Sequence, residues 1–188
     1  MSDWKIVPAG TSWAKEGNRV KIGDGVEIGQ GAFVGDYAVL GRGAKLGEGA
    51  FVGEGARLGK GAVVGDCASL GDGASLGKGA SLGEGASLGR GASLGEGAVV
   101  GNYASLGEGA VVGPNASNPI DIGFADGYRK TISQVNNTAY IGAGCRWFTL
   151  SEAITHWMNH KEDRSLTMLL LESAKAIATA KGWEFHGN

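Results

Sequence analysis

The fold of this chain is decided by a repeat whose most regular part reads ASLGDGASLGKGASLGEGASLG (residues 68–89). Across 16 consecutive units from Ile22 to Val112, every sixth residue is Ile, Leu or Val, and Gly follows it directly. The fourth residue after each aliphatic residue is Ala, except Val26. The unit is therefore [ILV]-G-x-G-A-x. An internal repeat of fixed period indicates a repetitive, solenoid-like architecture.

A period of six fits neither an α-helix nor a long alternating strand. It fits a short strand followed by a corner, with the aliphatic residue and the Ala pointing inward. We expect both glycines of each unit to lie at the corner, because glycine adopts positive φ without steric cost. Three units would close one triangular coil, and successive coils would stack through backbone hydrogen bonds.

These units resemble the bacterial hexapeptide-repeat family. The resemblance implies a left-handed parallel β-helix, and the handedness comes from the resemblance alone. At about 18 residues per coil and a rise of ~4.8 Å, the run makes a little over five coils, roughly 25 Å in length. We therefore predict a mainly β fold, a left-handed parallel β-helix of hexapeptide repeats with a small C-terminal α+β module.

The composition bounds the class of protein. Among 188 residues, 17 Lys and Arg oppose 19 Asp and Glu, so nothing in the charge points to a nucleic-acid polymer or an anionic membrane. No stretch is apolar enough to span a bilayer, and the N-terminus lacks a secretory signal pattern. Cys67 and Cys145 lie in different segments and indicate no disulfide framework. We expect a cytoplasmic protein.

Three segments follow along the chain. Residues 1–20 contain Trp4 and Trp13, which we expect to form an N-terminal cap over the exposed end of the first coil. Residues 21–117 form the β-helix, and residues 118–188 form the C-terminal module. In that module, Asn136-Asn137 predicts a hairpin turn between two strands. Thr149-Leu-Ser-Glu152 predicts a capping box at the start of a helix that reaches about His160.

A second helix is expected from near Asp163 or Ser165 to Gly182. Its apolar residues fall at helical spacing, so we expect one side of it to pack on the hairpin or on a neighbouring subunit. The residues that define this side are Leu166, Leu169, Leu170, Ala174 and Ile177.

The residue before each aliphatic residue points outward, and Phe33 and Phe51, 18 residues apart, should stack on the same face. Members of the resembled family usually pack three around an axis. Exposed aromatic side chains suit such an interface, so we assign Phe33 and Phe51 to a homotrimer contact. A sugar- or base-stacking site is the alternative for this pair.

The best-known members of the resembled family are acyltransferases that take their acyl group from coenzyme A or an acyl-carrier protein. Many depend on a His in or beside the coils as general base. Here no His precedes His156. Under an acyltransferase interpretation, His156 and His160 are the catalytic candidates, reaching a groove from another subunit. Glu152, His156 and His160 share a helical face, but the pattern is too incomplete to predict a metal site.

Two segments of the C-terminal module are the most distinctive outside the repeat, residues 125–130 and 142–148. If the hairpin brings them together, their basic and aromatic side chains would form an anion pocket beside a helix N-terminus. The candidate ligand-binding residues are Tyr128, Arg129, Lys130, Arg146 and Trp147. In the alternative, Arg146 pairs with Asp126 and Trp147 belongs to the core. A catalytic Cys145 has little support, because no His lies near it in sequence.

The C-terminal segments loosely resemble modules of phage and prophage repeat proteins. Together these features favour a non-catalytic homotrimeric scaffold or binding protein with no cofactor, and the resemblance of the C-terminal segments points to a phage origin. It would recognise a small anionic ligand such as a nucleotide or an acidic sugar. The first alternative is a hexapeptide-repeat acyltransferase with an inter-subunit site that uses acetyl-CoA or another acyl-CoA. The second is a purely structural spike or decoration protein.

Overall fold

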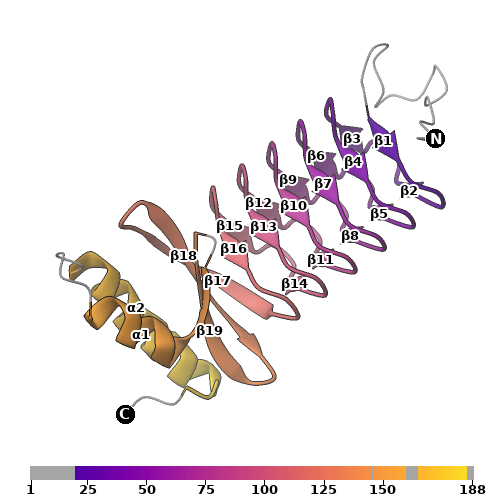
Figure 1. Cartoon of the computed structure of the whole chain (residues 1–188). Helices are drawn as coiled ribbons and strands as arrows, with labels where there is room; N and C mark the ends of the chain where they lie inside the picture. Colours follow the sequence, from indigo (N-terminus) through magenta and orange to yellow (C-terminus); the bar gives the residue numbers. More distant parts are fainter. Residues whose placement is uncertain (1–19, 145, 160–164, 186–188) are drawn as a thin grey trace.

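The computed structural model describes residues 20–144, 146–159 and 165–185. A column of coils leads into a twisted sheet, and two helices cover the far side of that sheet (Figure 1). The expected cap of Trp4 and Trp13, and the candidates Cys145 and His160, lie outside the described residues.

Sixteen two-residue strands build the coils. Their bounds are β1 Lys21–Ile22, β2 Glu27–Ile28, β3 Phe33–Val34, β4 Val39–Leu40, β5 Lys45–Leu46, β6 Phe51–Val52, β7 Arg57–Leu58, β8 Val63–Val64, β9 Ser69–Leu70, β10 Ser75–Leu76, β11 Ser81–Leu82, β12 Ser87–Leu88, β13 Ser93–Leu94, β14 Val99–Val100, β15 Ser105–Leu106 and β16 Val111–Val112. Three strands make one coil, so the column has about five turns.

Every third strand pairs in parallel, which gives the column three flat sheets. The first sheet has the order β1-β4-β7-β10-β13-β16, and the third runs from β3 through β6, β9 and β12 to β15. The second begins β2-β5-β8-β11-β14 and continues into the C-terminal module. Paired residues lie 18 apart, as in Ser75↔Ser93. The predicted parallel β-solenoid is therefore confirmed.

The inward positions of the repeat form one continuous core. Leu40, Leu82 and Leu94 are almost completely buried, as are the alanines between the strands, such as Ala62 and Ala80. Because successive strand residues point to opposite faces, one residue of each two-residue strand enters this core and the other faces outward. The position of a residue within the six-residue repeat therefore predicts whether its side chain is buried.

The two glycines of each unit have different roles, which corrects the expectation that both supply positive φ. The second glycine does so, as at Gly61 with φ 67°, where an added β-carbon would meet no atom within 4 Å. The first glycine, directly after the aliphatic residue, is needed for coil spacing. A β-carbon added to Gly59 would lie 2.6 Å from the carbonyl carbon of Gly77 in the next coil. Only glycine lets the coils approach to hydrogen-bonding distance.

Four corners carry another residue in place of the second glycine, at Tyr37, Cys67, Tyr103 and Asn115. All four adopt positive φ, between 55° and 59°. This conformation costs roughly 1–2 kcal/mol for a residue with a β-carbon.

Four antiparallel strands extend the second sheet beyond the coils: β17 Ser117–Ala125, β18 Tyr128–Val135, β19 Thr138–Ala143 and β20 Arg146–Thr149. The first of them still pairs in parallel with β14 through Val99↔Ser117, so the expected boundary at 117/118 falls inside β17. The turn between β18 and β19 contains Asn136 and Asn137, both at positive φ, which confirms the predicted hairpin.

The helices α1 (Leu150–Met158) and α2 (Ser165–Lys181) pack on the side of this sheet that faces away from the coils. Thr149 caps α1, and the predicted capping box with Glu152 is confirmed. Neither helix has a run of apolar residues long enough to cross a bilayer.

The buried side of α2 differs in part from the predicted one. Leu166 and Leu169 are exposed, whereas Ala174 is buried as predicted, and the helix also buries Thr167, Leu171 and Ala178. The Thr167 hydroxyl donates a hydrogen bond to the Asp126 carboxylate, and the small alanines let the helix approach the sheet closely. The sequence prediction considered mainly large apolar residues. It therefore missed the contacts that a polar residue, Thr167, and a small residue, Ala178, make with the sheet.

Replacing a first glycine should be far more costly inside the column than at its end. In Gly59→Ala, the new methyl group meets backbone atoms of the next coil, so we expect a loss of about 2–3 kcal/mol in unfolding free energy. In Gly101→Ala, the same position of a later unit, no atom lies within 4 Å of the new methyl group. Urea denaturation should find this control within about 1 kcal/mol of the parent chain. Equal losses would contradict the spacing role.

The capping box should make stability depend on pH. Hydrogen bonds from the Thr149 amide and hydroxyl lower the pKa of Glu152. The ionised carboxylate therefore stabilises the fold above its unfolded pKa of about 4.3, and this contribution is lost as the pH falls through the lower folded pKa. Denaturation curves should show Glu152→Gln less stable than the parent near neutral pH, with the gap closing below about pH 4. Thr149→Ala, which removes the cap, should cost about 1 kcal/mol.

Candidate functional site

At the junction between the last coil and the added strands, side chains occupy the place that a further coil would take. Within the column, the amide of the first glycine donates to a carbonyl 17 residues later, as Gly89 does to Leu106. At Gly107 the acceptor is instead the Asp121 carboxylate, at 2.9 Å. The Val111 carbonyl accepts a hydrogen bond of 2.6 Å from the Thr131 hydroxyl. Side chains of the added strands therefore pair these two backbone groups at the end of the column.

An open pocket of about 580 Å³ lies at this junction. Its wall on the coil side is Glu108 and Gly109, at the corner between β15 and β16. The opposite wall comes from the β17–β18 hairpin and the β19–β20 turn, through Phe124, Tyr128, Arg129 and Gly144. The structure thus brings Tyr128 and Arg129 of the first predicted segment next to Gly144 of the second.

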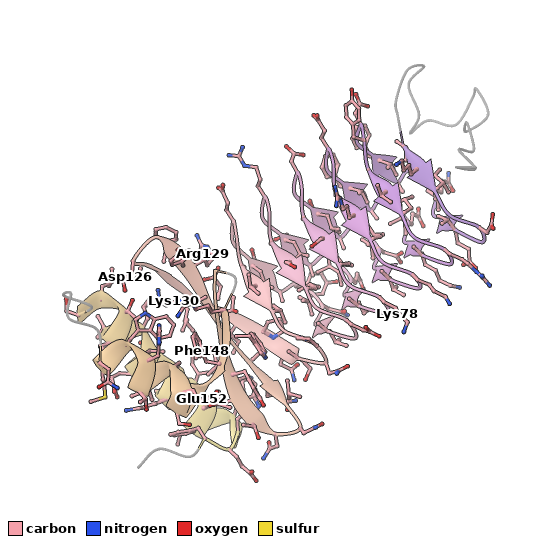
Figure 2. The ribbon with its side chains drawn as sticks, viewed as in Figure 1. Lys78, Asp126, Arg129, Lys130, Phe148 and Glu152 are labelled. Carbon is pink, nitrogen blue, oxygen red and sulfur yellow. The ribbon has the colours of Figure 1, made fainter. Side chains whose placement is uncertain are left out.

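Arg129 is fixed at the edge of this pocket, near the label in Figure 2. Its Nη1 donates to Asp121 at 2.8 Å, and its Nε donates to the Glu108 carbonyl at 3.3 Å. The guanidinium lies against Gly107, where a β-carbon would come within 2.3 Å of its Cζ. Glu108 itself faces Arg90, with 3.5 Å between Oε1 and Nε. Positive and negative charges therefore balance around the pocket.

Lys130 points away from the pocket, so it does not contribute to the predicted anion site. The side chain is completely buried between the sheet and the helices, and its Nζ donates to the Ala125 carbonyl at 2.6 Å. The same nitrogen lies 5.5 Å from the centre of the Trp157 ring. Adjacent residues of a strand face opposite sides, which separates Lys130 from Arg129.

Trp147 closes the end of the coil core instead of lining the pocket. Its indole covers Gly113, where a β-carbon would lie 2.1 Å from Cε2. It also stacks on Tyr140 with 5.5 Å between ring centres and packs against the aliphatic core of the column. Gly113 occupies the first-glycine position of its unit, so the indole takes the place of the missing next coil.

Arg146 and His156 meet on the outer side of the added sheet. Nη1 of Arg146 and Nε2 of His156 lie 3.1 Å apart, and because a guanidinium can only donate, a hydrogen bond here requires the lone pair of Nε2. The ring stacks on Phe148 at 5.1 Å and meets Trp157 edge-on. The Asp126 carboxylate accepts a hydrogen bond from Thr167, and the Arg146 guanidinium contacts His156.

Two exposed features lie on the coils. Phe33 and Phe51 stack with 5.0 Å between ring centres, and each is 43% exposed.

At the corner between β14 and β15, the Tyr103 hydroxyl donates to Glu84 at 2.7 Å, and this bond raises the pKa of Tyr103. The phenol therefore keeps its proton at neutral pH and is a poor nucleophile.

Sequence reasoning missed Glu108, Asp121 and Phe124. In the sequence, Glu108 is one of many charged residues at the corners of the repeat. Only its place in the last coil, next to the added strands, distinguishes it from the others. Asp121 and Phe124 lie in β17, where two register irregularities against β18 decide which way each side chain points. Among the described residues, no group of three His, Cys, Asp or Glu side chains converges as a metal site.

Comparison with known proteins identifies the repeat. Residues 25–60 match the family model "Bacterial transferase hexapeptide (six repeats)". No curated protein matches the chain. A variant of GDP-perosamine N-acetyltransferase from Caulobacter crescentus, in complex with CoA and GDP-perosamine, is 24% identical with a TM-score of 0.45, over 52% of this chain and 49% of that chain.

Two further solved structures are similar. The acetyltransferase domain of PglB from Neisseria gonorrhoeae, in complex with acetyl coenzyme A, is 24% identical with a TM-score of 0.47, over 52% of this chain and 50% of that chain. A hexapeptide transferase family protein from Anaplasma phagocytophilum is 18% identical with a TM-score of 0.44, over 90% of this chain and 95% of that chain. The matched region spans about half the length of the two acetyltransferases.

These findings correct the expected function. The interpretation as a non-catalytic scaffold or binding protein for an anionic ligand is wrong, because the family model that the coils match is that of bacterial transferases. Nothing in the comparisons supports the resemblance to phage modules. The finding favours the first alternative, an enzyme that transfers an acyl group, and with it a donor in place of the expected absence of a cofactor.

Proposed function

We propose that the protein is an acyltransferase, because residues 25–60 match the bacterial transferase hexapeptide family model. The acyl donor would be a thioester of CoA or of an acyl-carrier protein. The match of residues 25–60 to the transferase family carries this proposal, and the unbroken repeat on either side of them extends the same scaffold.

His156 is the proposed general base. The donor supplies the thioester, and the acceptor must lose a proton from a hydroxyl or amine as it attacks. A neutral imidazole whose Nε2 accepts a hydrogen bond can receive that proton. Arg146 occupies this lone pair in the structure, and its exposed side chain would have to give way to the acceptor. Stacking on Phe148 holds the ring in place.

One corner of the column fits a phosphate-bearing donor. The corner between the first and second sheets carries the exposed cations Arg42, Lys60 and Lys78 in three successive coils, and we call these three residues the basic corner. Asp24 and Glu96 occupy the same position in the coils before and after them, and Lys78 pairs with Glu96 at 3.0 Å. The neighbouring outward residue Arg57 adds a further positive charge. The other two corners are mainly acidic, with Asp36, Glu54 and Asp72 on one and Glu48, Asp66 and Glu84 on the other. Phosphate groups of CoA would bind the basic corner through its guanidinium and ammonium groups.

The basic corner and His156 lie on different parts of one protomer, the first on the coils and the second on the terminal module. We therefore propose an inter-subunit site in a homotrimer, with Phe33 and Phe51 in the contact. A pair of stacked aromatic rings exposed on a flat sheet supports this assignment, since burial of apolar area favours association.

Removing the imidazole should abolish transfer. We expect His156→Ala to lower the release of free thiol from acetyl-CoA by about 100-fold or more, the usual contribution of a general base. Thiol release should be followed with a thiol-reactive chromophore in the presence of a panel of hydroxyl and amine acceptors. His160→Ala tests the second candidate in the same assay.

Tyr103→Phe is the matched control, because it removes the hydroxyl that bonds Glu84 and leaves the module intact. It should leave turnover unchanged. If turnover is unchanged in both histidine variants, a histidine is not the general base.

Separating the subunits should also remove activity if the site lies between them. We expect Phe33→Ser combined with Phe51→Ser to convert a trimer to monomers in sedimentation experiments and to lower thiol release at least about tenfold. Ser69, the next outward residue of the same sheet, is already polar, and Ser69→Ala serves as control. A monomeric double variant with full turnover would rule out an inter-subunit site.

A further inference from the structure

The outer side of α2 carries a regular line of exposed residues at intervals of three and four. The two leucines at its start are 52% and 63% exposed, although leucine is a residue that folding usually buries. The helix buries a different line, which includes Thr167 and Ala174. Intervals of three and four place residues on one side of a helix, in the pattern by which two helices pair. The exposed line, which we call the α2 stripe, consists of Leu166, Leu169, Ser173, Ala176 and Ala180.

The α2 stripe changes in size along the helix, from two leucines at its start to two alanines at its end. At its middle, Ser173 donates its hydroxyl to the Leu169 carbonyl of the same helix at 3.1 Å, so it can enter an apolar contact without losing a hydrogen bond. Two copies of such a stripe fit together when they run antiparallel, because Leu166 of one then packs on Ala180 of the other. A parallel pair would place leucine on leucine and leave a gap between the alanines.

The charges beside the α2 stripe favour the same arrangement. Glu172 and Lys175 lie next to its centre and pair within one helix at 2.7 Å. A two-fold axis near Ser173 would reverse the order of these charges in the second helix, so Glu172 of each copy would lie beside Lys175 of the other. In a parallel pair, Glu172 would instead lie beside a second Glu172. Opposite charges on facing helices set the orientation in which the helices pair.

The place of α2 in the molecule indicates what kind of copy it meets. The helices cover the side of the added sheet that faces away from the coils, so the outer side of α2 lies at the C-terminal end of the column (Figure 1). A helix of 17 residues is about 25 Å long and ~10 Å wide, so one pair would bury roughly 500 Å² of the two surfaces. A stable specific interface needs about 1,200 Å² or more. One pair is too small to hold two monomers, whereas three pairs formed at once by two trimers are large enough.

We propose that two homotrimers of this chain associate end to end through their C-terminal modules and form a hexamer. Each α2 stripe pairs antiparallel with the α2 stripe of a protomer in the opposite trimer, on one of three two-fold axes. The hexamer rests on the homotrimer proposed above and is independent of acyl transfer. Because a single pair is too small to persist, a variant that cannot form trimers is monomeric, as expected above for the combined substitution of Phe33 and Phe51.

Sedimentation velocity on the full chain, over a wide range of concentration, tests the hexamer. We expect hexamers of the 19.1 kDa chain that dissociate to trimers on dilution. Leu166→Glu and Leu169→Glu should each weaken the association of trimers at least about tenfold, because each pair would then bury an unpaired carboxylate. Val63→Glu is the matched control, since it makes a similar change at an exposed coil residue beside Lys45. It should leave the hexamer intact.

Exchange of the flanking charges tests the antiparallel orientation. Glu172→Lys would bring two lysines together across each pair and should weaken the hexamer about tenfold over the three pairs. Lys175→Glu should act in the same way through two carboxylates. The combined Glu172→Lys and Lys175→Glu variant restores the opposite charges within and between helices, so it should associate as the parent does. Single variants that associate as tightly as the parent would overturn the antiparallel pairing.

A parent chain that stays trimeric at every concentration would overturn the inference and keep the homotrimer. Leucine variants that form hexamers as the parent does, or an equal loss in Val63→Glu, would also overturn it. Co-sedimentation with vesicles of phosphatidylcholine and phosphatidylglycerol tests a membrane as the occupant. Vesicle binding by a trimeric parent that Leu169→Glu abolishes would assign the face to a membrane and overturn the hexamer. A monomeric parent would refute the homotrimer together with the hexamer, whatever the thiol-release assay shows.

Discussion

The whole structure depends on how closely one coil can approach the next. Backbone hydrogen bonds between coils, such as Gly59 to Leu76 at 2.7 Å, require the first glycine of each unit to lie directly on the backbone of the following coil. A β-carbon there would overlap the chain, so the residue is fixed by space and not by backbone torsion. The aliphatic column and the buried alanines can fill the interior only because this spacing holds.

The same constraint explains how the column ends. Where a further coil is missing, the first glycines Gly107 and Gly113 are covered by the Arg129 guanidinium and the Trp147 indole. Asp121 supplies the acceptor that the absent carbonyl would have given. The C-terminal strands therefore cap the solenoid with side chains of matching shape and polarity, which removes an exposed sheet end that could otherwise pair with other chains. The open pocket lies at the edge of this cap, and Arg129 belongs both to the cap and to the wall of the pocket.

Much of the fold could be predicted from the sequence, because its signals are local. Aliphatic residues six apart define the strands, Asn136-Asn137 defines a hairpin, and Thr149 with Glu152 defines a helix start. The candidate site was predicted less well. Tyr128 and Arg129 do line a pocket, but Lys130 is buried on the opposite side of the strand and Trp147 is part of the cap. Which side each faces depends on the irregular register of β17 and β18, which no short sequence pattern specifies.

The sequence by itself determined the architecture of this protein, since a six-residue period repeated without failure is satisfied by a stacked β-solenoid that turns the aliphatic residues into one core. It also determined the number of coils, because each further 18 residues add one turn. Only the tertiary structure decided the character of the pocket. Arg129 looks like an anion ligand in the sequence, yet Asp121 and the Glu108–Arg90 pair balance its charge. Electrostatic character is set by distances between residues far apart in the chain, and those distances exist only after folding.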